Sequence, residues 1–218
     1  MEGIERLPGG PSVVCFSHQN WADPLLVLAA IPQRPRTYFF GPEQGEMRRG
    51  FRNCLMRWAG VAIPYRPGRR GLVAATARAE ALLGHGSTVA IAGEGRIHSG
   101  ERIVLPLERG PAYLALRAQV PLVPLAINGT GWLGFRRVVR VRVGLPIPPG
   151  PGSLVRPDAA DVDRMTAAVQ SALEGLITDF PDQPRPGLIG RCLTELFNEW
   201  PEGTRPPVPA RKDDSWTY

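Results

Sequence analysis

The hydrophobic and polar positions of the chain alternate between short apolar runs and longer mixed segments. Short runs rich in apolar and β-branched residues predict strands, here over residues 13–16, 37–40, 61–65, 87–92 and 120–127. The segments between these runs predict helices, one starting at Pro24 and others over residues 47–58, 71–83 and 111–118. Strands and helices that alternate in this way indicate an α/β sheet covered by helices.

Three details refine this pattern. Pro64 in the third strand favours the end or the edge of a sheet, because proline has no N–H to donate to a central ladder. Gly84 is expected to close the helix that precedes it. Residues 138–143 alternate valine with arginine, which predicts a half-exposed strand. The helix over residues 47–58 carries several arginines and either packs on the sheet or lies at a membrane surface.

The C-terminal third differs from the rest in composition. A Pro/Gly linker over residues 145–152 precedes a long amphipathic helix expected over residues 158–180. Residues 181–218 form a Pro-rich tail with one short amphipathic segment between Ile189 and Trp200. That segment either docks on the domain or touches a membrane. We therefore predict one domain over residues 1–180 and a tail over residues 181–218.

Composition and charge narrow the class of protein. With 218 residues, of which 43% are hydrophobic, the chain is long enough to bury a sizeable core. The net charge of +6 favours anionic partners, namely nucleic acid, acidic lipid headgroups, phosphorylated substrates or acidic carrier proteins. Nucleic acid is the weakest of these, because the arginines are dispersed and no aromatic–basic module is visible.

The sequence also bears on the compartment. The first ten residues contain no apolar signal region, and no stretch approaches the roughly 20 apolar residues of a membrane span. Three cysteines lie far apart without metal-ligand spacing and are expected to be reduced, namely Cys15, Cys54 and Cys192. We expect a cytoplasmic protein that meets a membrane only at its surface.

Candidate chemistry centres on residues 11–28, PSVVCFSHQNWADPLLVL. His18 ends the first strand, and Asp23 stands directly before Pro24, where the helix begins. Asp23 has a purely structural interpretation as the N-cap, with Pro24 at the first helical position, and His18 has one as a polar loop residue. Alternatively, the turn returns Asp23 to one nitrogen of His18, which fixes the imidazole tautomer and leaves the other nitrogen as a base for a hydroxyl.

Two further strand ends carry polar groups. Arg66 follows the third strand, and Glu94, Gly95 and Arg96 follow the fourth. Ligands of open α/β sheets bind beyond the carboxyl ends of the strands, so we expect these groups to converge with His18. The two arginines would bind a phosphate with their fork geometry, and glycine lets the backbone approach a ligand closely. The carboxylate would hold an arginine or the free hydroxyl of an acceptor.

Four segments together resemble the motifs of the glycerolipid acyltransferases, the 1-acylglycerol-3-phosphate acyltransferase-like family with a His-x-x-x-x-Asp motif. SHQNWADPLL at residues 17–26 resembles the first motif, and GVAIPYR at 60–66 the second. VAIAGEGR at 89–96 resembles the third motif, Phe-Pro-Glu-Gly-Thr-Arg, and VPLVPLAINGT at 120–130 resembles the fourth. The segments follow the order of the family, and the resemblance covers roughly residues 12–147.

The resemblance implies a fold and a reaction. The fold is α/β, with a mixed, largely parallel sheet flanked by helices, as in glycerol-3-phosphate acyltransferases. The reaction moves a fatty acyl group from acyl-CoA or acyl-carrier protein to the hydroxyl of a lysophosphatidate-like acceptor, without a metal or another cofactor. His18 would be the general base and Asp23 its orienting carboxylate. Arg66, Arg96 and the backbone at Gly95 would hold the acceptor phosphate, and the protein would lie on an anionic membrane surface as a peripheral enzyme.

The third motif departs from the family pattern. Ala92 and Gly93 stand in place of Phe-Pro, and the Thr is missing, so that Arg96 directly follows Gly95. This difference leaves the headgroup of the acceptor open. It also leaves open a catalytically silent protein of the same fold that binds lipid or a membrane surface. His98 is a further candidate for a polar contact near the site.

Overall fold

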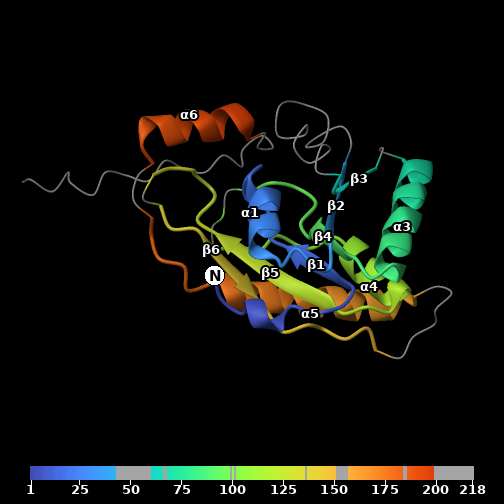
Figure 1. Ribbon diagram of the computed structural model, residues 1–218. Coiled ribbons are helices and arrows are strands. Elements are labelled where there is room, and N and C mark those ends of the chain that lie inside the picture. Colours follow the sequence, from blue (N-terminus) through green and yellow to red (C-terminus); the bar gives the residue numbers. More distant parts are fainter. Residues whose placement is uncertain are drawn as a thin grey trace, which may run out of the picture.

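The protein is described here by a computed structural model. It describes residues 1–42, 60–65, 68–98, 100, 102–135, 137–150, 157–183 and 186–198. The predicted helix over residues 47–58, Arg66 and the tail from residue 199 lie outside the described residues. In the described part of the chain, helices cover both faces of one sheet (Figure 1).

The sheet has six strands in the order β3-β2-β4-β1-β5-β6. They are β1 (Ser12–Phe16), β2 (Thr37–Pro42), β3 (Ala62–Tyr65), β4 (Thr88–Ala92), β5 (Leu122–Asn128) and β6 (Arg140–Val143). The first five run parallel, and β6 pairs antiparallel with β5. The predicted mixed, largely parallel sheet is therefore confirmed, and β3 with Pro64 lies at an edge, as proline favours.

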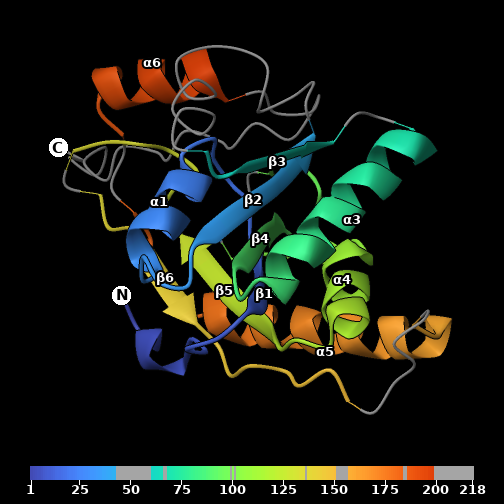
Figure 2. The ribbon, with the colours of Figure 1, turned by 45° about the vertical axis from the view of Figure 1, so that its right-hand side comes forward.

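Helices cover both faces of the sheet, and the last of them lies beyond the ends of the strands (Figure 1). They are the short η1 (Ile4–Arg6), α1 (Asp23–Ala30), α3 (Arg69–Gly84), α4 (Gly110–Ala118), α5 (Ala159–Ile177) and α6 (Leu188–Phe197). Successive strand residues point to opposite faces. In β1, Val13 and Cys15 face the core formed with α3, α4 and α5, whereas Val14 and Phe16 face α1. Figure 2 shows the sheet between α1 on one side and α3 and α4 on the other.

Most predicted elements are present, and two helix ends differ from expectation. Gly84 is the last residue of α3 rather than the residue after it, and the left-handed conformation falls at Gly86, with φ 82°. The long helix ends at Ile177 instead of Phe180, although Phe180 is still buried. It starts at Ala159, one residue after the expected start, and the side chain of Asp158 caps it by accepting a hydrogen bond from the N–H of Ala159 at 2.8 Å. The described helices include none that is both long and apolar enough to cross a bilayer.

The parallel register places three strand ends at one edge of the sheet. Phe16 at the end of β1 lies beside Ala92 of β4 and Leu125 of β5. The chain therefore leaves these three neighbouring strands on the same side. The segments that follow, residues 17–23, 93–98 and 129–134, meet there.

Candidate functional site

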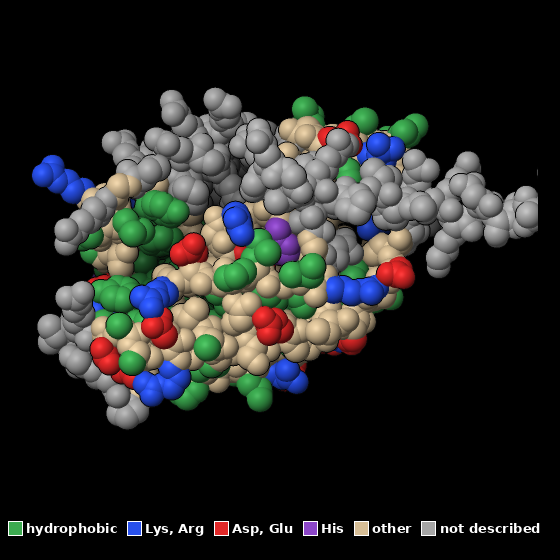
Figure 3. Space-filling model, turned by 180° about the vertical axis from the view of Figure 1, so that it is seen from behind, with side chains coloured by type: hydrophobic (Ala, Val, Ile, Leu, Met, Phe, Trp, Pro, Cys, Tyr) green, Lys and Arg blue, Asp and Glu red, His purple; other side chains and the backbone are tan. Residues whose placement is uncertain are grey.

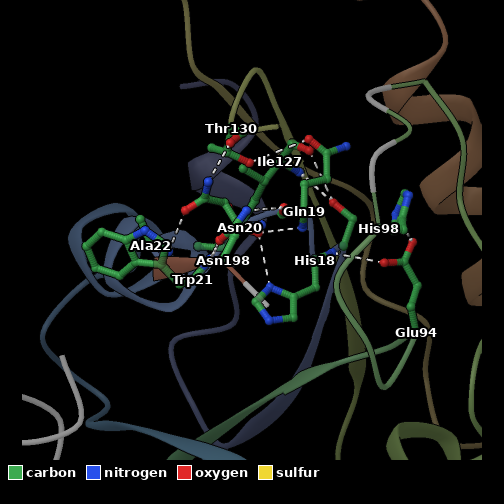
Figure 4. A network of polar contacts seen from close by, with 12 residues as sticks. His18, Gln19, Asn20, Trp21, Ala22, Glu94, His98, Ile127, Thr130 and Asn198 are labelled. Atoms are coloured by element: carbon green, nitrogen blue, oxygen red, sulfur yellow. Dashed lines mark hydrogen bonds and ion pairs between the residues drawn. The ribbon is translucent and has the colours of Figure 1, made fainter. Parts of the chain in front are cut away.

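His18 and Asp23 form a buried pair in the turn between β1 and α1. Figure 4 shows His18 within the surrounding network of polar contacts. The Nδ1–H of His18 donates a hydrogen bond to Oδ2 of Asp23 at 3.1 Å. With Nδ1 as the donor, the lone pair of a neutral imidazole is on Nε2. The ring of Phe16 packs edge-on against the imidazole, with centroids 5.8 Å apart. The geometry thus selects one tautomer and one ring orientation.

The carboxylate of Asp23 also organises the turn itself. Its Oδ2 accepts the backbone N–H groups of Gln19 at 2.6 Å and of Asn20 at 2.7 Å. Asp23 is the first residue of α1, and Ala22 holds the N-cap position. Among the described contacts, Oδ2 of Asp23 bonds only to donors of the preceding turn, and its buried Oδ1 has no partner. The N-cap interpretation is therefore wrong for this side chain, and the pairing with His18 is the observed arrangement. Asp23 does not cap the helix because the preceding turn supplies three hydrogen-bond donors to its Oδ2.

Asn20 fixes the same turn from the other side. Its Oδ1 accepts the N–H of Ala22 at 3.0 Å, and its Nδ2 donates to the carbonyl of Thr130 at 2.8 Å. Gln19 is fully buried and donates through Nε2 to the carbonyl of Gly100 at 3.1 Å. These bonds join the turn to the segment after β5 and to the segment after β4.

Glu94 holds the main chain of His18. Its Oε2 accepts the backbone N–H of His18 at 3.1 Å, and its Oε1 accepts Nε2–H of His98 at 3.0 Å and the N–H of Leu105 at 3.2 Å. The N–H of His98 in turn donates to the carbonyl of His18 at 3.3 Å. The segment after β4 therefore contacts His18 at both its N–H and its carbonyl.

His98 is part of this support. It is buried, and its Nδ1 accepts the N–H of Gly100 at 3.1 Å. An acceptor at Nδ1 leaves the proton of a neutral imidazole on Nε2, where it is donated to Glu94. Both nitrogens of His98 thus bond to protein groups. His85 lies away from this network at the exposed end of α3, and its Nδ1 donates to the carbonyl of Ala81.

The two glycines of the third motif, Gly93 and Gly95, are favoured at their positions for different physical reasons. A Cβ on Gly93 would lie 2.5 Å from Sγ of Cys15 and 3.0 Å from Cδ2 of Leu107, so the packed strand ends require a glycine here. Gly95 is exposed and has φ 65°, a conformation that glycine adopts without strain.

Burial raises the pKa of the Cys15 thiol, and the nearby Glu94 carboxylate raises it further.

The predicted site residues divide into three groups. His18, Asp23 and Glu94 come together in one buried network. Gly95 and Arg96 are exposed beyond the end of β4. Arg66 lies outside the described residues, although Tyr65 before it ends the edge strand β3.

Sequence reasoning missed four residues that complete the site. Gln19, Asn20 and Thr130 lie in polar runs that directly follow apolar strands, and this position in the sequence could have marked them as candidates. Asn198 gave no signal, because it lies at the end of α6. Its Oδ1 accepts the N–H of Trp21 at 2.9 Å, and its Nδ2 donates to the carbonyl of Gln19 at 3.4 Å.

Comparisons with known proteins identify the fold and the family. Among solved structures, the fold is similar to the crystal structure of the 1-acyl-sn-glycerophosphate (LPA) acyltransferase PlsC from Thermotoga maritima, with a TM-score of 0.60 and 22% sequence identity. The match covers 83% of this chain and 73% of that one, and it establishes a common fold. A search of curated proteins gave no match. Residues 1–128, which include the His18 turn and the Glu94 segment, match the family model described as Acyltransferase. Because this match spans more than half of the sequence, the chain belongs to the acyltransferase family.

Proposed function

We propose that this acyltransferase moves a fatty acyl group from acyl-CoA or acyl-carrier protein to the hydroxyl of a lysophosphatidate-like acceptor. The observation that carries the proposal is the buried bond between Nδ1 of His18 and Oδ2 of Asp23. It stands at the carboxyl end of a central parallel strand, where ligands of such sheets bind.

The pair supports general base catalysis. Nε2 of His18 accepts the proton of the acceptor hydroxyl while its oxygen attacks the thioester carbonyl. The C–S bond then breaks, the new ester C–O bond remains, and the leaving thiolate takes the proton from Nε2. The Asp23 carboxylate stabilises the imidazolium between these steps, and Glu94 keeps the main chain of His18 in place.

The acceptor phosphate is assigned to the cations beyond the strand ends. Arg96 is exposed next to Gly95, whose backbone is accessible at the same turn. Arg66 follows the end of β3 in the sequence and is proposed as the second cation. Guanidinium groups bind a phosphate in bidentate fashion, which makes them suited to a phosphomonoester headgroup. Both carboxylate oxygens of Glu94 bond to protein donors, so we assign it to positioning His18 rather than to holding an arginine or a hydroxyl.

The test compares wild type, His18→Ala and His85→Ala with labelled acyl-CoA and, separately, acyl-carrier protein. The acceptors are lysophosphatidate and the corresponding monoacylglycerol, which differ only in the phosphate. We expect transfer by wild type and by His85→Ala, and a loss on the order of a hundredfold or more in His18→Ala. Full turnover by folded His18→Ala would refute the assignment of the base.

The phosphate assignment has its own readout. Arg96→Ala is expected to raise KM for lysophosphatidate and to leave KM for the monoacylglycerol unchanged, with Arg78→Ala on the exposed side of α3 as the control. A KM for lysophosphatidate equal to that of wild type would remove Arg96 from the acceptor site. Binding of lipid without turnover on either donor would favour the silent lipid-binding alternative.

A further inference from the structure

Helix α6 packs on the protein through small and polar residues. Gly190, Thr194 and Asn198 recur every fourth residue and are buried. Oγ1 of Thr194 accepts the N–H of Leu133 at 2.9 Å and donates to the carbonyl of Gly190 at 2.8 Å. A Cβ at Gly190 would overlap the carbonyl oxygen of Leu133, so only glycine allows this close approach. The inward face of α6 is therefore its polar face.

The outward face of α6 is apolar. Its large side chains are strongly exposed, namely Leu188 (78%), Ile189 (78%), Leu193 (44%) and Leu196 (74%). Figure 3 shows hydrophobic side chains projecting along the outer edge of this helix, at the upper right of that view. A helix on a water-soluble domain normally turns its apolar stripe toward the core. The orientation of α6 is the reverse, so its apolar stripe is available to an apolar partner.

A further exposed apolar side chain lies in the loop that α6 contacts. The loop that receives α6 contains Leu133 and Gly134, and Phe135 follows directly with 93% of its surface exposed. The exposed stripe of α6 and Phe135 are called the apolar ridge below. Because the exposed side chains of α6 project outward from a convex helix, they suit insertion into a soft apolar layer better than closure around a single ligand.

The apolar ridge lies at the same edge of the sheet as His18. Asn198, at the end of α6, bonds to the backbone of Trp21 and Gln19, which follow His18 in the turn. Figure 1 shows α6 beyond the ends of the strands, on the side where α1 begins. A layer that receives the ridge is therefore within reach of the site.

We propose that the apolar ridge of α6 and Phe135 inserts into an anionic lipid bilayer and holds the site at its surface. The net charge of +6 matches anionic headgroups, and a bilayer accepts a protruding amphipathic helix in its interface. The choice of a bilayer rests on the proposed function, whose acceptor is an amphiphile anchored in the same layer. The ridge then brings His18 to the acceptor, so the acceptor need not leave the membrane.

The test is flotation of the full chain with vesicles of phosphatidylcholine alone or with added phosphatidylglycerol. Leu196→Glu and Ile189→Glu place a charge on the ridge. Leu145→Glu is the matched control, because Leu145 is 71% exposed but lies near the amino ends of the parallel strands. We expect wild type and Leu145→Glu to float with anionic vesicles, and the two ridge variants to lose tenfold or more of the bound fraction.

A label on α6 gives a second readout. Cys192 is exposed on this helix, so a polarity-sensitive dye attached there in a Cys54→Ser background should shift to the blue with anionic vesicles. Equal flotation of wild type and both ridge variants would overturn the proposal. The proposal would also be overturned if the wild-type protein formed a dimer and did not float, and if Leu196→Glu dissociated that dimer. Because flotation requires no turnover, a protein that floats through the ridge but transfers no acyl group would contradict only the proposed function.

Discussion

The backbone N–H of His18 donates to Oε2 of Glu94 at 3.1 Å, although 76 residues separate the two in the sequence. The donor is a main-chain group, so Glu94 does not contact the imidazole in this bond. It affects the imidazole by fixing the backbone of the residue that carries it. We therefore infer that the acidic residue of the third motif positions the histidine of the first motif. Its other oxygen is occupied by His98 and Leu105.

Glu94→Gln is expected to lower kcat about tenfold or more with little change in KM. An amide offers one acceptor oxygen instead of two, so at least one of the buried donors loses its partner, namely the N–H of His18, the N–H of Leu105 or Nε2–H of His98. The loss is expected to lower the free energy of unfolding by about 1–3 kcal/mol. Steady-state kinetics and a thermal melt measure the two effects. Glu5→Gln, at an exposed position, is the control, and an unchanged kcat in Glu94→Gln would contradict the positioning role.

Asp23→Asn is expected to lower kcat on the order of a hundredfold or more. The amide oxygen can still accept the N–H groups of Gln19 and Asn20, but the negative charge that stabilises an imidazolium on His18 is gone. The measurement is kcat with a fixed donor and acceptor. Asp158→Asn at the start of α5 serves as the control, because that carboxylate bonds only within its own helix end among the described contacts. A kcat within a few-fold of wild type would show that Asp23 merely shapes the turn.

Gly93→Ala is expected to destabilise the protein by about 1–3 kcal/mol, because the new methyl group overpacks the core. The nearest atom is Sγ of Cys15, at 2.5 Å from an ideal Cβ. Removing that sulfur with Cys15→Ala should recover part of the loss. Denaturant unfolding of wild type, both single variants and the double variant measures the coupling. Strictly additive free energies would show that Cys15 is not the cause.

Asp179→Asn is expected to lower the melting temperature at neutral pH and to matter less in acid. Hydrogen bonds from Arg142 hold the pKa of Asp179 below its ordinary value. A carboxylate whose pKa is lower in the folded state stabilises the protein above its unfolded pKa, and this contribution is lost as the pH falls through the folded pKa. Melting curves of both proteins between pH 7 and about pH 3 should therefore converge toward the acid end. A difference independent of pH would contradict the ion-pair origin.

The sequence predicts the fold and the first motif well. Apolar runs mark the strands, and parallel strands carry the polar residues after them to one edge, which is why His18 and Glu94 were expected to meet. The role of Asp23 was ambiguous, because Asp-Pro is also a good helix start. Only the tertiary arrangement shows that its oxygen faces three donors of the preceding turn.

The inward contacts of the third motif were beyond sequence reasoning. A carboxylate after a strand suggests a ligand contact, but the partners of Glu94 are main-chain donors, which no residue type reveals. The absence of proline from this motif now has a physical account, because the Cys15 side chain occupies the space beside Gly93. Asn198 was unpredictable since its partners lie 177 residues or more away.

The turn after β1 collects its partners from almost the whole described chain. Glu94, Thr130 and Asn198 lie 76, 110 and 177 residues beyond the groups that they contact. Closing loops of this length costs chain entropy, and contacts between such distant residues slow folding. During synthesis the His18 turn leaves the ribosome before these partners, and it acquires its last described partner only after residue 198 has emerged. We therefore expect a nascent chain to remain inactive until α6 has docked, so that recovery of turnover marks the end of folding and not its beginning.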